Sequence, residues 1–139
     1  MNKIKFLIKH IIFRLVRKSI PEKLSKGEAF IKAWLSYNNV KFEQQYYVKV
    51  PKEVRNSGCC YIDFMVSRYG KQYAIEFNGR QHYFYIPKFH KNLDGFSKQQ
   101  FRDKFIEQWC LENHIEFIEI PYTYSTAQIE MVLRERFKL

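Results

Sequence analysis

The stretch YIDFMVSRYGKQYAIEFNGRQHY, residues 61–83, decides the fold, because it predicts two apolar strands joined by a short turn. Each predicted strand carries a carboxylate near its middle, Asp63 in the first and Glu76 in the second. Burying an ionised carboxylate without a partner is costly, because the group loses its water. We therefore expect something positive to compensate both side chains.

Side chains alternate between the two faces of a strand, so Asp63 should share a face with Met65, and Ile62 should lie on the other. If the two strands are paired neighbours, Asp63 and Glu76 can converge. Two close carboxylates repel each other unless a cation lies between them, and Mg²⁺ prefers such oxygen-rich sites. The sequence therefore predicts a site for Mg²⁺, with Mn²⁺ as a substitute. The structural alternative is a pair of salt bridges to arginines such as Arg80 or Arg102.

The remaining chain predicts an α/β domain with a mixed central β-sheet flanked by helices. Periodicity and turn residues predict helices at about 25–38, at 98–113 with Ser97 as cap, and after Thr126 as cap, and strands at 41–50, 60–67, 72–78 and 115–122. Residues 84–96 are predicted to form an aromatic and basic loop.

Composition favours one domain with a polyanionic partner. The 139 residues are 46% hydrophobic and 18% aromatic, enough to bury a core. The net charge is +10, and residues 1–26 alone carry eight basic residues against Glu22. Such a surplus favours nucleic acid or an anionic membrane surface over a small acidic substrate.

Residues 1–20 predict a basic amphipathic arm, followed by the domain at residues 21–139. Charges interrupt its apolar residues too often for a membrane span or a signal peptide. Three interpretations stay open: a helix docked on the domain, contact with the DNA backbone, and binding to a membrane surface or a partner. The candidate nucleic-acid contacts are Lys3, Lys5, Lys9, Arg14, Arg17 and Lys18 in the arm and Arg80, Lys88 and Lys91 in the domain.

The cysteines Cys59, Cys60 and Cys110 form no CxxC pair and have no accompanying His spacing, which argues against a zinc site. We expect three free thiols in a reducing cytoplasm.

An Asp on one strand, a short turn and a Glu on the next strand, between a helix with Glu28 and a helix with Lys104, resemble the core of the PD-(D/E)XK nuclease superfamily. The phrases IEFNGRQHY and FRDKFIEQWCLENHIEFIEIPY resemble small endonucleases related to very-short-patch repair and to phage homing enzymes. This resemblance covers about residues 25–122. It implies a restriction-endonuclease-like three-layer core, a bacterial or phage origin, and a Glu, Asp, His, Asp set at Glu28, Asp63, His82 and Asp103.

Two positions depart from the superfamily pattern. Ile62 stands where a Pro precedes the first Asp, and Asn78 stands where the Lys of Glu-x-Lys is expected. Lys104 is one candidate for the missing cation. His82 is the candidate general acid or base, with Gln81 orienting water or phosphate.

Several of these residues also have ordinary structural interpretations. Glu28 follows Ser25 by three residues, which is the spacing of a capping box. His82 could be a core histidine, and Asp103, near Glu107, could belong to a solvated helix face.

Three function classes follow. The first is a metal-dependent DNA endonuclease that nicks or acts on branched DNA. The second is a catalytically inactive nucleic-acid-binding module on the same fold, and the third is a membrane-surface or partner-binding protein. The sequence leaves open RNA as a substrate and assembly into a homodimer.

Overall fold

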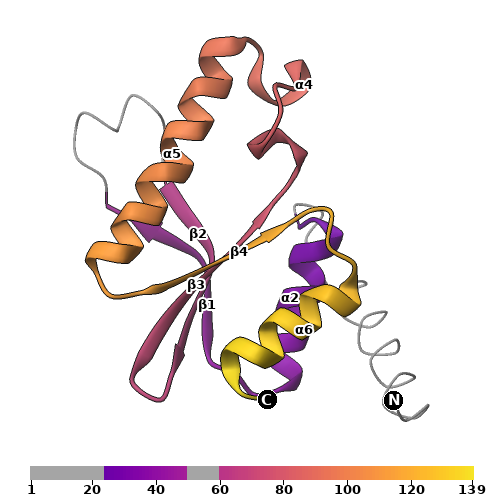
Figure 1. Cartoon of the computed structure of the whole chain (residues 1–139), viewed down its shortest axis with the longest axis vertical. Helices are drawn as coiled ribbons and strands as arrows, with labels where there is room; N and C mark the ends of the chain where they lie inside the picture. The colour runs from indigo at the N-terminus through magenta and orange to yellow at the C-terminus, as the bar shows by residue number, and fades with distance from the viewer. Residues whose placement is uncertain (1–23, 50–59) are drawn as a thin grey trace. The chain divides into compact units, whose positions relative to one another are not determined.

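The computed structural model describes residues 24–49 and 60–139. The chain divides into two compact units (Figure 1). One unit is Phe42–Tyr124 and carries the sheet, and the other joins the residues before Phe42 to Ser125–Leu139.

The sheet unit confirms the predicted α/β class with a mixed sheet. Its four strands, in the spatial order β1-β2-β3-β4, are β1 (Phe42–Val48), β2 (Cys60–Arg68), β3 (Lys71–Asn78) and β4 (Glu116–Pro121). The β1–β2 and β2–β3 pairs are antiparallel, and β3–β4 is parallel. The parallel pair follows from the helical connection between β3 and β4, since only a crossover brings the chain back in the same direction.

A two-residue turn joins β2 to β3. Arg68 pairs with Lys71, and the intervening Tyr69 and Gly70 have φ values of 50° and 74°. Positive φ at both central positions is typical of a type I′ turn, whose twist suits an antiparallel hairpin. This turn sets the register that brings Asp63 and Glu76 to the same level of the sheet.

The segment after β3 is more helical than the sequence predicted. It contains the 3₁₀ turn η1 (Arg80–His82), the short helix α4 (Pro87–His90) and the long helix α5 (Leu93–Glu112). The predicted start of α5 at Lys98 with Ser97 as cap was wrong, because the Asn92 side chain caps the helix by accepting from the Gly95 amide at 2.9 Å. Gly95 is needed there, since a Cβ would collide with the His90 carbonyl oxygen.

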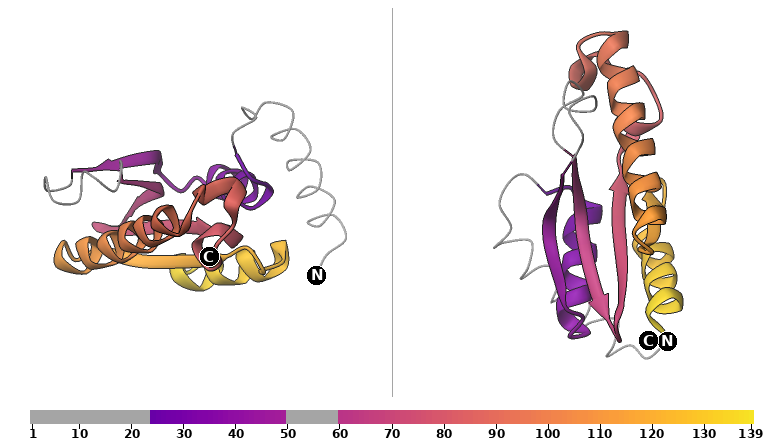
Figure 2. Two further views of the ribbon diagram at one scale, coloured as in Figure 1. Left: turned by 90° about the horizontal axis from the view of Figure 1, so that it is seen from above. Right: turned by 90° about the vertical axis from the view of Figure 1, so that its left-hand side faces the viewer.

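Helix α5 lies along one face of the sheet (Figure 2). Ile106 and Cys110 on α5 pack with Met65 of β2 and Ala74 of β3 in an apolar cluster. The other buried members of this cluster are Val48, Cys60, Ile62 and Ile115. This packing fixes α5 over the sheet and so positions Asp103 and Lys104 one turn before Ile106.

The second unit contains α2 (Lys26–Tyr37) and α6 (Thr126–Phe137). Trp34 of α2 stacks on Phe137 of α6, with ring centroids 6.2 Å apart. The cap of α6 is Ser125, one residue before the predicted Thr126, because Ser125 and Gln128 form a capping box. Across residues 24–49 and 60–139, none of the helices has the length and apolar character needed to cross a membrane.

Candidate functional site

Asp63 and Glu76 lie at the point where β2 and β3 stop pairing through their backbones. The regular ladder ends at the pair Phe64 and Ile75. Beyond it, the Phe77 amide donates to Asp63 Oδ2 at 2.9 Å, and the Asp63 amide donates to Glu76 Oε1 at 3.3 Å. Each carboxylate therefore takes the place of a backbone carbonyl in the gap between the two strands, and both side chains are half-buried.

Strand alternation breaks at the same place. The expectation that Ile62 and Met65 lie on opposite faces was wrong, because both belong to the apolar cluster under α5. Gln45 of β1, opposite Asp63, has a left-handed φ of 52°. Its side-chain Nε2 lies 3.4 Å from Asp63 Oδ1. Positive φ is uncommon for a residue other than glycine and locally reorients the strand.

A second carboxylate lies beside Glu76 on the next strand. Glu119 of β4 pairs in register with Glu76. Its Oε1 accepts from the Asn78 side-chain amide at 2.8 Å and from the Tyr83 hydroxyl at 2.7 Å. Burial, followed by the hydrogen bond and the charge of Glu119, raises the pKa of Tyr83 well above its usual range, so Tyr83 stays protonated and donates.

The sequence interpretation did not select Glu119, although the same signal was present. A carboxylate in the middle of the apolar strand IEFIEIP is the pattern that singled out Asp63 and Glu76. Asn78, at the expected lysine position, is only 6% exposed and is held by this contact to Glu119.

His82 of η1 and Asp103 of α5 form a close pair. His82 Nδ1 lies 2.9 Å from Asp103 Oδ2, and the two side chains are 17% and 32% exposed. Because a carboxylate only accepts, Nδ1 carries the proton of this bond, which leaves Nε2 as the ring nitrogen that can accept or release a proton.

A chain of hydrogen bonds along α5 orients Asp103. Arg102 donates to Gln99 Oε1 at 3.2 Å, and Gln99 Nε2 donates to Asp103 Oδ1 at 3.1 Å. Gln99 Nε2 is also 3.4 Å from His82 Nδ1, a longer contact between two donors. Asp103 is thus held on one oxygen by Gln99 and on the other by His82.

The pairs His82–Asp103 and Asn78–Glu119 border one polar hollow of about 200 Å³. Asn78 and Glu119 line it from the sheet, His82 and Tyr83 from the segment after β3, and Gln100, Asp103, Lys104, Glu107 and Phe117 complete its wall. His82 and Lys104, the alternative candidates for proton transfer and for the missing cation, therefore line the same hollow.

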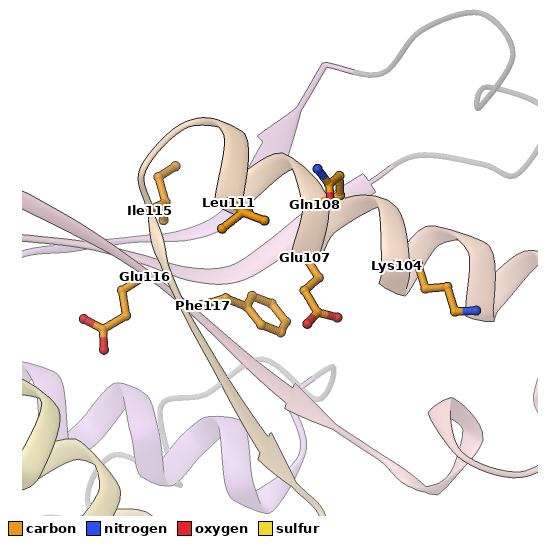
Figure 3. Close-up of a pocket in the computed structure, with 7 residues that line it drawn as sticks. All are labelled: Lys104, Glu107, Gln108, Leu111, Ile115, Glu116 and Phe117. Atoms are coloured by element: carbon orange, nitrogen blue, oxygen red, sulfur yellow. The ribbon is translucent and has the colours of Figure 1, made fainter.

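Lys104 also borders a larger hollow between α5 and β4, of about 630 Å³ (Figure 3). In this view the Glu107 carboxylate lies beside the Phe117 ring, while Lys104 points away from Glu116, toward the N-terminal half of α5. Lys104 is exposed, so its ammonium can approach a bound anion without losing much hydration.

Glu76 and Glu107 both act on the buried thiol of Cys110. Burial is the main cause, followed by the negative charges of Glu76 and Glu107, and together they raise the pKa of Cys110 to about 12. Cys110 therefore remains a neutral thiol in the core. Cys60 is buried in the same apolar cluster, and Cys59 lies outside the described residues.

Glu28 makes the ordinary structural contact that its spacing indicated. Its Oε2 accepts from the Ser25 amide at 2.9 Å, and the Ser25 hydroxyl accepts from the Glu28 amide at 3.2 Å. The capping box is therefore present in α2, in the unit that does not contain Asp63.

The remaining predicted site residues are Gln81 and the basic candidates for nucleic-acid contact. Those in the domain lie in or near η1 and α4, and those in the arm lie outside the described residues. Gln81 lies between Arg80 and His82 in η1 and is half-buried. Arg80, Lys88 and Lys91 are exposed. The six predicted basic contacts of the arm, Lys3, Lys5, Lys9, Arg14, Arg17 and Lys18, lie outside the described residues.

Asp63 and Glu76 suit a hard divalent cation as a pair of carboxylates. Each accepts a backbone amide, which orients the carboxylate. Within the described part of the chain, no group of three or more His, Cys, Asp or Glu side chains is arranged to hold a metal ion. Mg²⁺ keeps several waters and is commonly held by one or two carboxylates, so it is the cation to which such a pair is suited.

Comparison with known proteins finds three viral relatives. The chain is 49% identical over 50 residues to "Uncharacterized protein 307L" of Invertebrate iridescent virus 6, a match that covers 36% of this chain and 25% of the relative. It is 39% identical over 65 residues to "Uncharacterized protein 033L" of Invertebrate iridescent virus 3, covering 47% and 34%. It is 43% identical over 63 residues to "Uncharacterized protein 094L" of Frog virus 3, covering 45% and 39%.

The matched segments thus span well under half of each relative's length. No protein-family model matches the chain, and no solved structure matches it.

Proposed function

We propose that this protein is a metal-dependent DNA endonuclease. The observation that carries the proposal is the pair Asp63 and Glu76 in the gap between β2 and β3, where each carboxylate accepts the other strand's backbone amide. Two partly buried carboxylates at the end of a strand ladder have a high desolvation cost, and a bound cation offsets it.

The element order supports the nuclease resemblance. A helix with Glu28 precedes the strand with Asp63, Glu76 follows on the next strand, and the helix with Lys104 comes before β4. The proposal includes a restriction-endonuclease-like three-layer core.

Asp63 and Glu76 would hold Mg²⁺. When bound there, the ion would polarise the phosphodiester and lower the pKa of an attacking water. The backbone amides of Asp63 and Phe77 keep both carboxylates oriented toward the gap.

His82 supplies the proton transfer. With Nδ1 bonded to Asp103, its Nε2 is available to take a proton from water or to return one to the leaving oxygen. Lys104 places a positive charge on the wall of the same hollow, where Asn78 carries none. Gln81, next to His82 in η1, orients water or phosphate.

Relaxation of a supercoiled plasmid tests the proposal. Wild-type protein should nick the plasmid with Mg²⁺ or Mn²⁺ and leave it intact in EDTA. Asp63→Asn and Glu76→Gln should each abolish nicking. Glu116→Gln is the matched control, because Glu116 is also a strand carboxylate but pairs with Lys71 at 3.0 Å, away from the gap.

An inactive DNA-binding module is the second candidate function, and Asn78 favours it. The side chain at the lysine position is buried against Glu119 and offers no positive charge to a phosphate. Plasmid that is bound but never nicked, with any divalent metal and at any pH from acid to alkaline, would select this function over the nuclease.

A further inference from the structure

The segment that follows β3, residues 80–91, carries exposed aromatic rings beside exposed cations. Here it is called the aromatic–basic segment. It contains Arg80, Lys88 and Lys91 and has no acidic residue. Phe84 is 52% exposed and Phe89 is 56% exposed, and Tyr83 and Tyr85 are partly exposed beside them.

Each exposed phenylalanine has its own cation. The Arg80 guanidinium carbon lies 5.6 Å from the centre of the Phe84 ring, and the Lys88 ammonium lies 5.8 Å from the centre of the Phe89 ring. The segment therefore repeats one arrangement, a flat apolar ring next to a positive charge.

Buried His90 anchors α4, the short helix that carries Phe89. His90 accepts the Ile86 amide on Nδ1 at 2.9 Å and packs against Tyr85 and Phe96, with ring centroids 5.9 and 5.1 Å away. These contacts hold α4 and so the backbone that carries Phe89. Pre-organised rings lose less entropy when a ligand stacks on them.

We infer that the aromatic–basic segment binds unpaired bases of a DNA strand, with Phe84 and Phe89 as stacking surfaces and Arg80, Lys88 and Lys91 on the phosphates. Every base has a flat face that stacks on an aromatic ring, and every nucleotide brings a negative phosphate to a neighbouring cation. Bases paired inside a duplex do not offer these faces. The lack of any carboxylate in the segment fits this polyanionic partner and not a basic peptide.

This inference rests on the proposed function and deepens it by naming the substrate class. Arg80 and His82 belong to the same turn, η1, so a strand held at Arg80 and Phe84 passes next to the proposed proton-transfer group. The expected substrate is therefore single-stranded DNA or a duplex with a locally unpaired strand, such as a fork or flap.

Fluorescence anisotropy with the full-length protein in EDTA tests the inference without requiring cleavage. The probes are labelled oligo(dT), a duplex of the same length and a forked duplex. Wild-type protein should bind oligo(dT) and the fork more tightly than the duplex. Phe84→Leu with Phe89→Leu should weaken oligo(dT) binding by about a hundredfold, roughly tenfold per ring, and change duplex binding by less than about threefold.

Two further variants separate stacking from general damage. Phe84→Tyr with Phe89→Tyr keeps both rings and should retain oligo(dT) binding. Tyr69→Leu is the matched control, because Tyr69 is 91% exposed and has Arg68 at 4.7 Å but lies in the β2–β3 turn, at the opposite end of β3. Its binding to all three probes should be unchanged.

Equal binding of oligo(dT) by the leucine variant and wild type would overturn the inference, as would an equal loss for oligo(dT) and duplex. Binding to phosphatidylserine vesicles that depends on Phe84 and Phe89, without oligo(dT) binding, would also overturn it and favour a membrane surface.

If the plasmid is never nicked but oligo(dT) binding depends on the rings, the nuclease proposal fails and this inference stands. If the plasmid is nicked but the leucine variant binds oligo(dT) normally, this inference fails and the nuclease proposal stands.

Discussion

His82 Nδ1 lies 2.9 Å from Asp103 Oδ2, which joins the turn after β3 to the middle of α5. This contact fixes the imidazole with Nε2 as its available acceptor, on the wall of a hollow that Asn78, Lys104 and Glu119 also line. The two residues lie 21 positions apart, and the packing of α5 on the sheet brings them together.

Replacing His82 should affect rate and pH dependence together. His82→Ala should lower the rate of plasmid nicking by about a hundredfold or more, because general acid–base catalysis is lost. The wild-type rate should change with pH, because catalysis needs the imidazole in the right protonation state. The alanine variant should lack this change, which a rate–pH profile measures.

Lys104→Ala is the comparison for that experiment. It removes a charge from the same hollow without removing a titrating imidazole, so we expect a milder loss of rate and an unchanged pH profile. A severe loss in Lys104→Ala with little effect of His82→Ala would contradict the assignment and make Lys104 the main catalytic residue.

The metal site should appear in thermal stability even when no DNA is present. A cation that binds only the folded protein raises the melting temperature by mass action. Mg²⁺ or Mn²⁺ should therefore raise the melting temperature of wild type and of Glu116→Gln, and the rise should vanish in Asp63→Asn and Glu76→Gln. Differential scanning fluorimetry over a metal titration measures this, and an equal rise in all four proteins would exclude the site.

Asn78 should matter for stability through its bond to Glu119. Asn78→Asp places two carboxylates side by side at a buried position, so we expect a loss of about 3 kcal/mol in the free energy of unfolding at neutral pH. Repulsion raises the pKa of the new pair, so the loss should shrink as the pH falls and the pair takes up a proton. Urea unfolding at pH 7 and pH 5 measures the difference.

Asn78→Lys tests the departure from the nuclease pattern. A lysine there would meet Glu119 with a positive charge and would return a cation to the position that the superfamily pattern expects. Nicking that is faster than wild type, or that is partly recovered in a Lys104→Ala background, would support a role for that cation. Slower nicking in both backgrounds would show that the Asn78–Glu119 contact is itself needed.

The sequence predicted the sheet because its signals are local. Asp63 and Glu76 interrupt clear apolar strands, and the Tyr69–Gly70 turn fixes which residues face each other. Their place at the same level of the sheet follows from that register. The backbone exchange between Asp63 and Phe77 could not be predicted, since it depends on where β2 and β3 part.

Other features depend on contacts that no local pattern reports. The early start of α5 depends on the Asn92 cap and on room for the His90 carbonyl beside Gly95, whereas the sequence predicted a loop over residues 84–96. The partner of Asn78 was missed because Glu119 is 41 residues away and becomes its neighbour only through the parallel β3–β4 pair. The left-handed Gln45 has no sequence signal of the kind that a glycine would give.

Glu28 can be tested without disturbing the helix it caps. Glutamine also serves at the third position of a capping box, so Glu28→Gln should keep the melting temperature within about 2 °C of wild type. If Glu28 takes part in catalysis, this variant should lose nicking. Ser25→Ala is the control, since it should cost about 1 kcal/mol of stability and leave nicking unchanged below the unfolding transition.

The basic arm should reveal its role in the salt dependence of DNA binding. Deleting residues 1–20 removes six basic residues and no acidic one. If these side chains contact phosphates, binding releases their counterions, and each lost contact should flatten the slope of log affinity against log salt by about 0.9 for a duplex. Anisotropy titrations at several salt concentrations, with two unrelated duplex sequences, should show the same flattening for both, because phosphate contacts do not distinguish sequence.

Circular dichroism checks that the shortened protein is folded. An unchanged slope in a folded truncation would rule out phosphate contact by the arm, and liposome co-sedimentation of the two proteins would then separate a membrane role from docking on the domain.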